Sequence, residues 1–299
     1  MDITTLYFGY GSNLDEADWA RWCEEKGYEM PTLTPVEAAW LPGHSLRFHY
    51  RSIKRKGGAA DVVPDQPGTA VPGMLFSLDE QAWHLVDEKE GHPNHYKRCH
   101  VTVLTTKGEV VEAITYRVVP EKRQSQLIPP APGYRSIVQR GLEHYKLPIE
   151  HLKKSIEIFE ANSTLDHVFV YGTLMEGEQR WPQLRPWSSG AQPGSIRGGL
   201  HHLGAYPGLR LDEEGVVHGE LHRCGELSDA LAVLDRIEGC DDGDPESGLY
   251  VRVPVEVHVE SGSVWAWTYA INQLPATARR LHEGRWVACL LYTSDAADD

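Results

Sequence analysis

The sequence predicts an α+β protein that contains two copies of one small unit, each a curved sheet or barrel with helices on its outside. Two observations predict this fold class: the same motifs occur twice in the same order, and strands outnumber helices in both copies. The length of 299 residues also suits two domains. We therefore expect one domain over residues 1–163 and another over residues 164–290, divided in a short polar stretch.

The first repeated motif is an apolar strand that runs into a Tyr-Gly turn. The two turns read Tyr10-Gly11-Ser12-Asn13-Leu14 and Tyr171-Gly172-Thr173-Leu174. Small residues at these positions allow a sharp turn that exposes successive N–H groups, which can bind a carboxylate or an oxyanion. A tight turn without a ligand is the alternative. A dinucleotide fingerprint is disfavoured, because Leu14 stands where its third glycine belongs.

The second repeated motif is a helix that ends in Glu-Gly. A capping box at residues 77–80 and the left-handed stop at Gly91 bound the first helix, while Ser228 and Gly239 bound the second. Glu90 and Glu238 thus fall in the last turn, where the helix dipole raises the pKa of a carboxyl group. Each is a candidate general base, or else a solvated glutamate at a fraying end.

The remaining motifs complete each copy. Tyr96 and Tyr250 each precede an alternating strand, and a further strand closes the copy at residues 113–116 and 266–269. Helices are expected over residues 134–145 and from Pro148 to Asn162, and the second helix has no counterpart in the other copy. The polar tail at residues 291–299 is expected to be disordered and non-native.

Composition limits the classes of partner. The net charge of −14 disfavours nucleic acid and anionic membranes, and the short basic run at residues 51–56 is interpreted as a solvated loop. No apolar stretch has the length of a membrane span, so we expect a cytoplasmic protein. Five scattered cysteines without a CxxC pair predict reduced thiols and no structural zinc.

Together the ordered motifs resemble a known superfamily. Residues 5–161, with the Tyr-Gly-Ser-Asn-Leu turn, Glu90-Gly91, Tyr96 and the stretch around Tyr134, are similar to a γ-glutamylcyclotransferase. Residues 167–272 are similar to its γ-glutamylamine cyclotransferase (AIG2-like) branch. The resemblance implies two small mixed β-barrels with flanking helices.

The resemblance also implies a reaction and its residues. A γ-glutamyl substrate would cyclise to 5-oxoproline and release an amine or amino acid. One glutamate in each copy, Glu90 in the first and Glu238 in the second, would act as the general base and then as the general acid. No metal or cofactor is implied, and the expected partner is the small-molecule substrate. The implied substrate-binding residues are Tyr10, Gly11, Ser12, Asn13, Leu14, Tyr96 and Tyr134 in the first copy, and Tyr171, Gly172, Thr173, Leu174 and Tyr250 in the second.

Other interpretations stay open at this point. One or both copies could be catalytically silent and serve as a ligand-binding or interaction module, or the reaction could be amide hydrolysis by water. The two sites are also expected to differ in substrate. The second copy has a longer loop at residues 240–249 with four acidic residues (Asp241, Asp242, Asp244 and Glu246), which favours a cationic amine as leaving group.

Overall fold

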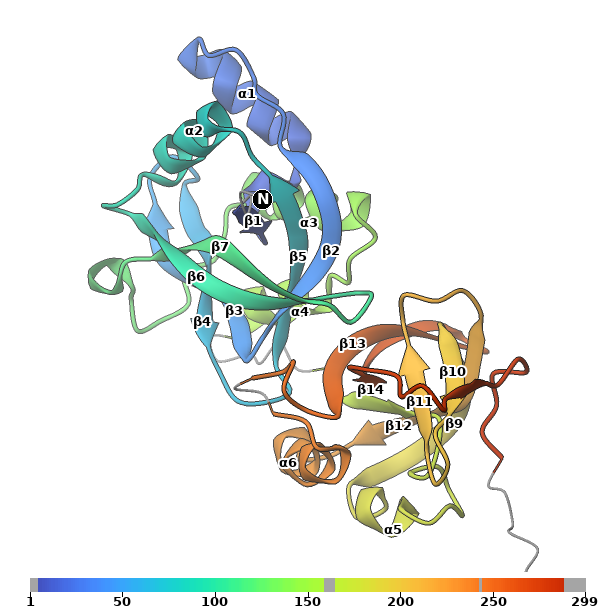
Figure 1. The fold of residues 1–299 in the computed structure, drawn as a ribbon. Coiled ribbons are helices and arrows are strands. Elements are labelled where there is room, and N and C mark those ends of the chain that lie inside the picture. Colours follow the sequence, from blue (N-terminus) through green and yellow to red (C-terminus); the bar gives the residue numbers. More distant parts are fainter. Residues whose placement is uncertain (1–4, 159–164, 242–243, 288–299) are drawn as a thin grey trace, which may run out of the picture. The chain divides into compact units, whose positions relative to one another are not determined.

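The computed structural model describes residues 5–158, 165–241 and 244–287. The chain divides into two compact units, Met1–Asp166 and His167–Asp299, and each is described by itself (Figure 1). The tail predicted to be disordered, residues 291–299, lies outside the described residues.

The first unit is built around a closed five-stranded barrel with the strand order β1-β5-β2-β6-β7. All neighbours are antiparallel except β1 and β7, which close the barrel in parallel. The strands are β1 (Leu6–Gly9), β2 (Thr34–Pro42), β5 (Ala70–Ser77), β6 (Tyr96–Thr105) and β7 (Val110–Val118).

The second unit repeats this topology strand for strand. Its barrel runs β8-β12-β9-β13-β14, and β8 and β14 again form the parallel closure. The strands are β8 (His167–Val170), β9 (Ser188–Arg197), β12 (Val216–Cys224), β13 (Tyr250–Val259) and β14 (Gly262–Ile271). The predicted α+β fold with two mixed barrels is therefore confirmed.

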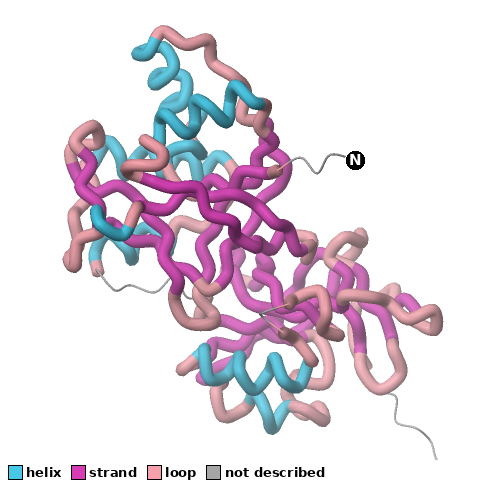
Figure 2. Tube along the Cα trace, turned by 60° about the vertical axis from the view of Figure 1, so that its left-hand side comes forward, coloured by secondary structure: helices cyan, strands magenta, loops and turns pink. Residues whose placement is uncertain are grey.

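Each unit adds a small sheet formed by two strands between its second and third barrel strands, and in the second unit β15, after the last barrel strand, joins that sheet. In the first unit β3 (His44–Ser52) pairs with β4 (Gly57–Pro64). In the second unit β10 (Gly199–His202) pairs with β11 (Pro207–Arg210) and β15 (Arg279–Arg280). The tube in Figure 2 shows that strands dominate both units, with helices around them.

The helices lie outside the barrels. They are α1 (Glu16–Lys26), α2 (Glu80–Glu90), α3 (Pro132–His144), α4 (Glu150–Glu157), α5 (Trp181–Leu184) and α6 (Leu227–Glu238), with 3-10 turns η1 (Ser12–Leu14) and η2 (Pro120–Lys122). Helix α3 starts at Pro132, two residues before the prediction. In the parts of the chain described, no helix is long and apolar enough to cross a membrane.

Two predicted helix starts are wrong, although both predicted stops are right. Asp79, not Ser77, caps α2, because its carboxylate accepts the Ala82 N–H at 2.7 Å. Helix α6 begins at Leu227, which places Ser228 inside its first turn. Gly91 and Gly239 end the two helices in the left-handed conformation, with φ of 67° and 62°. Both glutamates are thus fixed at a helix end.

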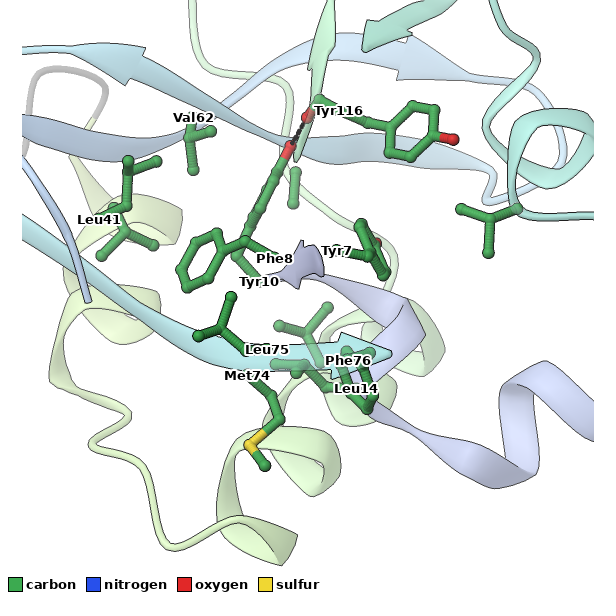
Figure 3. Packing of buried hydrophobic residues seen from close by; sticks show 14 of the residues in the cluster. Tyr7, Phe8, Tyr10, Leu14, Leu41, Val62, Met74, Leu75, Phe76 and Tyr116 are labelled. Atoms are coloured by element: carbon green, nitrogen blue, oxygen red, sulfur yellow. Dashed lines mark hydrogen bonds between the residues drawn. The ribbon is translucent and has the colours of Figure 1, made fainter. Parts of the chain in front are cut away.

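Aromatic side chains pack around β1 in the first unit (Figure 3). Tyr7, Phe8 and Tyr10 are all buried, and the Tyr10 hydroxyl donates to the carbonyl of Tyr116 on β7 at 2.7 Å. The Thr115 hydroxyl donates to the Phe8 carbonyl at 2.8 Å, and Thr268 repeats this bond with Phe169 at 2.9 Å. The same bonds therefore hold the strand that leads into the Tyr-Gly turn in both units.

In each unit, a glycine in the middle of a barrel strand, on β5 or on β12, allows the strand before the Tyr-Gly turn to approach it closely. A Cβ atom on Gly73 would collide with the Gly9 carbonyl, and one on Gly219 would collide with the Val170 carbonyl. Both collisions involve backbone atoms at the end of the strand that leads into the Tyr-Gly turn. The repeated glycine is thus needed where the turn begins.

Gly219→Ala is expected to destabilise the second unit by about 1–3 kcal/mol, the usual cost of overpacking. Its thermal transition should fall by several degrees, as measured by calorimetry of the full chain. Gly190→Ala on β9 is the control, because a Cβ there meets no atom within 4 Å. Equal transition temperatures for the two variants would contradict the steric argument.

We propose that the two units fold independently, because each has its own closed barrel and helices. Residues 1–163 and 164–290 are expected to express as separate soluble chains, each with one cooperative thermal transition. Insoluble fragments, or fragments without a transition, would show that the units depend on each other for stability.

Candidate active site

The first unit has a pocket of about 300 Å³ of empty space at the end of the barrel where β1 leads into the Tyr-Gly turn. Six of the predicted site residues of this copy line it together with Glu90. The full lining is Tyr7, Tyr10, Gly11, Ser12, Asn13, Ala60, Glu90, Tyr96, Tyr116 and Tyr134. The structure therefore brings most of the predicted residues of this site together, from segments more than 100 positions apart.

Leu14 is the exception. The predicted substrate-binding residue is only 2% exposed and does not line the pocket. Its side chain packs against Gly141 of α3, where an added Cβ would collide with it. The prediction for Leu14 is therefore wrong. Leu14 is the last residue of the turn motif, and its side chain is buried in the core.

Asn13 holds the Glu90 carboxylate. Its amide Nδ2 donates to Glu90 Oε1 at 2.8 Å and to the Tyr7 hydroxyl at 2.9 Å. Asn13 is 4% exposed, so this amide can fix the carboxylate orientation without competition from bulk water. Tyr7 keeps its proton, because burial and then the charge of Glu90 raise the pKa of its phenol. The turn, β1 and the end of α2 thus meet in one hydrogen-bonded group.

Burial is the largest cause of the raised pKa of Glu90. The neighbouring Lys89 ammonium and the Asn13 hydrogen bond oppose this shift. The sequence analysis predicted this direction but attributed it to the helix dipole, whereas the largest cause in the structure is desolvation. A carboxyl group with a raised pKa can accept and return protons near neutral pH.

The Tyr-Gly turn of the first unit also leaves backbone donors unpaired within the described residues. Leu14 N–H donates to the Gly11 carbonyl at 3.2 Å and forms one 3-10 turn. This leaves the N–H groups of Gly11, Ser12 and Asn13 without a hydrogen-bond partner in the described part of the chain. Three successive donors at the edge of a pocket can bind a carboxylate or an oxyanion.

Three tyrosines form the pocket walls. Tyr96 donates its hydroxyl to the Ala60 carbonyl at 2.7 Å, and Tyr134 accepts the Ala60 N–H at 3.3 Å. Tyr10 is tied to Tyr116 on β7. These bonds fix the aromatic rings, so the pocket has a defined shape before a substrate binds.

The second unit has an equivalent pocket of about 340 Å³. All the predicted site residues of this copy line it. The full lining is Phe169, Val170, Tyr171, Gly172, Thr173, Leu174, Tyr206, Pro207, Glu238, Tyr250 and Tyr269. Met175 N–H donates to the Gly172 carbonyl at 2.9 Å, which repeats the turn of the first unit.

Glu238 is held differently from Glu90. Leu174 replaces Asn13 in the turn, and the Arg180 guanidinium instead lies 3.5 Å from Glu238 Oε1. Glu238 is 8% exposed, and burial raises its pKa to about 7 although Arg180 opposes the shift. Both units therefore keep a glutamate of raised pKa, but with different partners.

A three-residue network behind each glutamate was not foreseen from the sequence. In the first unit the Asp87 carboxylate accepts from Arg98 at 2.8 and 2.9 Å and from the Tyr116 hydroxyl at 2.6 Å. In the second, Asp235 accepts from Arg252 at 2.6 Å and from Tyr269 at 2.7 Å. The aspartate precedes the glutamate by three residues in both repeats. This repeated spacing was the sequence signal from which the network could have been predicted.

This network ties the glutamate helix to two barrel strands. Asp87 lies on α2, Arg98 on β6 and Tyr116 on β7, and Tyr116 lines the pocket. The helix end is therefore fixed relative to the pocket floor, and the same argument applies to α6, β13 and β14. We assign positioning roles to these residues.

Arg55 is a further residue whose role the sequence interpretation missed. It belongs to the basic run assigned to a solvated loop, yet its guanidinium pairs with the buried Asp18 at 2.6 and 2.8 Å. It also donates to the Ser12 hydroxyl at 3.1 Å. The interpretation as a solvated loop is therefore wrong for Arg55.

A closed mixed barrel whose pocket joins a Tyr-Gly turn to a helix-end glutamate of raised pKa defines one class of protein, and this chain contains the arrangement twice. The family model described as "Gamma-glutamyl cyclotransferase, AIG2-like" matches residues 7–135 and 168–288. The chain therefore belongs to this family, and the two matched segments agree with the predicted tandem arrangement.

Curated relatives carry the same family name. A γ-glutamylcyclotransferase from Bos taurus is 27% identical over 154 residues, which are 50% of this chain and 76% of the relative. A γ-L-glutamyl-butirosin B γ-glutamyl cyclotransferase from Niallia circulans is 31% identical over 110 residues, or 36% of this chain and 69% of the relative.

Solved structures give similar matches. A structure titled γ-glutamyl cyclotransferase is 26% identical with a TM-score of 0.42, covering 52% of this chain and 87% of its own. The crystal structure of YkqA from Bacillus subtilis is 17% identical with a TM-score of 0.37, covering 90% of this chain and 84% of its own.

Proposed function

We propose that each unit cyclises a γ-glutamyl compound to 5-oxoproline and releases the amine part. The observation that carries this proposal is a helix-end glutamate of raised pKa that lines the pocket beside the Tyr-Gly turn in both units. The family membership supports the general cyclotransferase reaction.

The substrate supplies its own nucleophile. Its α-amine attacks the γ-carbonyl carbon, the new C–N bond closes a five-membered ring, and the C–N bond to the leaving amine breaks. The α-ammonium group loses two protons in total, and the departing nitrogen gains two. One carboxylate that accepts and returns protons is therefore sufficient, and Glu90 or Glu238 takes this role.

The other residues have matching roles. The N–H groups of the Tyr-Gly turn stabilise the oxyanion that forms on the γ-carbonyl oxygen. The fixed tyrosines hold the glutamyl chain folded, so that the amine lies close to the carbonyl carbon. In the first unit Asn13 keeps Glu90 oriented, and in the second Arg180 takes this place.

Two alternatives make different predictions. A silent binding module has no physical reason to keep an ionisable group buried in both pockets, since burial of a charge costs free energy. Hydrolysis by water would release glutamate instead of 5-oxoproline. Mass-spectrometric identification of the product, after incubation with γ-glutamyl amino acids, γ-glutamyl amines and ε-(γ-glutamyl)lysine, tests all three.

The proposal includes a difference in substrate between the sites. The first site is proposed to prefer γ-glutamyl amino acids or short peptides, and the second γ-glutamyl amines. Support comes from the loop after Glu238, where Asp241, Asp244 and Glu246 are exposed; Asp242, also counted in the sequence argument, lies outside the described residues. Exposed charges of this kind attract a cation weakly, by up to about 1 kcal/mol each.

Glu90→Gln and Glu238→Gln chains, each with one intact site, are expected to show opposite preferences between the two substrate types. The amine preference of the second site should weaken at high salt, because the acidic loop is exposed. Rates of 5-oxoproline formation at low and high salt measure both effects. Identical preference profiles in the two chains would contradict the proposal.

A further inference from the structure

Arg55 stands at the edge of the first pocket without lining it. Its guanidinium donates to the hydroxyl of Ser12 at 3.1 Å and lies 5.0 Å from the ring centroid of Tyr134. Both of these residues line the pocket, whereas Arg55 does not. A substrate held in the pocket by its glutamyl part would therefore meet Arg55 with the portion that extends outward, which is the leaving group.

The surroundings of Arg55 carry surplus positive charge. The carboxylate of Asp18, only 1% exposed, pairs with Arg21, Arg55 and Lys89. Arg21 also lies 3.8 Å from the Glu25 carboxylate, so Asp18 is left to balance two cations, Arg55 and Lys89. The pocket edge thus attracts an anion.

The Arg55 side chain also has donors left for a ligand. Three of its five N–H bonds go to Asp18 and Ser12. The Nε–H and one Nη1–H have no partner within the residues that the structure describes. The side chain is 21% exposed and held in place by Asp18, so its remaining donors have a fixed position at the pocket edge.

The second unit places its cation elsewhere. Arg180 contacts the turn through its backbone N–H, which donates to the Thr173 carbonyl at 2.7 Å. Its guanidinium points to Glu238 instead of the Thr173 hydroxyl, the counterpart of the Ser12 hydroxyl. The arrangement around Arg55 is therefore a feature of the first site and not of the repeat.

We propose that Arg55 is the specificity-determining residue of the first site and binds the carboxylate of the amino acid that leaves. This inference rests on the proposed function, and it names the residue that distinguishes γ-glutamyl amino acids from γ-glutamyl amines. Lys89 and Asp18 support it: Lys89 adds charge, and Asp18 fixes the guanidinium.

Two substrates that differ only in this carboxylate test the inference. γ-Glutamylalanine and γ-glutamylethylamine are assayed with the full chain carrying Glu238→Gln, so that only the first site turns over. Arg55→Gln is expected to lower kcat/KM for γ-glutamylalanine about tenfold or more, mainly through KM, since hydrogen bonds to charged groups are strong. For γ-glutamylethylamine, kcat/KM should change less than about twofold.

Matched variants separate recognition from structure. Arg21→Gln removes a cation from the same Asp18, but Arg21 is 54% exposed and contacts no lining residue, so both substrates should react as before. Arg55→Lys keeps the charge and should restore part of the selectivity, and it serves as the test should Arg55→Gln fail to fold. Equal losses for both substrates, or no loss for either, would overturn the inference.

Binding can be measured without turnover. The thermal shift that γ-glutamylalanine produces should exceed that of γ-glutamylethylamine, and Arg55→Gln should remove the difference. This result together with no 5-oxoproline would contradict only the proposed reaction. Product formation with equal shifts in wild type and variant would contradict only the role of Arg55.

Discussion

Glu90→Gln, in a chain whose second site already carries Glu238→Gln, is expected to lower 5-oxoproline formation about 100- to 10,000-fold, the usual contribution of a general acid–base group. Glutamine keeps the size of the side chain and can still hydrogen-bond with Asn13, so the pocket should keep its shape. It cannot accept a proton from the α-amine. The loss should appear mainly in kcat, with little change in the binding of substrate.

Glu88→Gln is the matched control. Glu88 lies on the same helix two residues earlier, and its carboxylate faces away to Lys26 and Tyr28. This variant should keep full activity and a native circular dichroism spectrum. A Glu90→Gln chain that retains more than about a third of first-site turnover would remove Glu90 from the mechanism.

Glu238→Gln is expected to remove second-site activity and yet stabilise the second unit at pH 8. Burial raises the pKa of Glu238 to about 7, from 4.5 for an ordinary glutamate. Because the unfolded chain releases this proton first, the free energy of unfolding falls as the pH rises between about 4.5 and 7. The full penalty is present above pH 7, and it amounts to at most about 3 kcal/mol.

Thermal unfolding at several pH values measures this effect. The Glu238→Gln variant should unfold several degrees above wild type at pH 8, and the difference should shrink toward pH 4.5. Glu256→Gln on β13 is the control, because Glu256 is exposed and its removal should change neither value. Lower stability of Glu238→Gln at pH 8 would mean that the ionised form of Glu238 is favoured by its surroundings.

The repeat made the fold accessible from sequence. Each motif occurs twice in the same order. The second copy therefore supported the prediction of a strand before Tyr-Gly and of a helix that ends in Glu-Gly. The stops at Gly91 and Gly239 were correct because a left-handed glycine ends a helix by local geometry. The start at Ser77 was wrong because Asp79 caps α2 instead, and the start at Ser228 was wrong because α6 begins at Leu227, after an N-cap Glu226 that makes no side-chain cap bond.

The site was less accessible, because its details depend on contacts between distant segments. The Tyr-Gly turns and Glu90 were found because they belong to short sequence motifs. The hydrogen bond from Asn13 to Glu90, in contrast, joins residues 77 positions apart. Arg55 was interpreted as solvated because its partner Asp18 lies on α1, 37 positions earlier in the chain. Leu14 was included because it belongs to the motif, although the turn directs its side chain into the core.

The most direct test of the central claim is the product formed in water labelled with heavy oxygen. We predict that wild type converts γ-glutamylalanine to unlabelled 5-oxoproline and alanine, and that the chain carrying both Glu90→Gln and Glu238→Gln forms almost none. Cyclisation breaks the amide without adding water, so no label can enter the product. Glutamate containing one heavy oxygen would show hydrolysis instead, and equal product from the double variant would contradict the assignment of both glutamates.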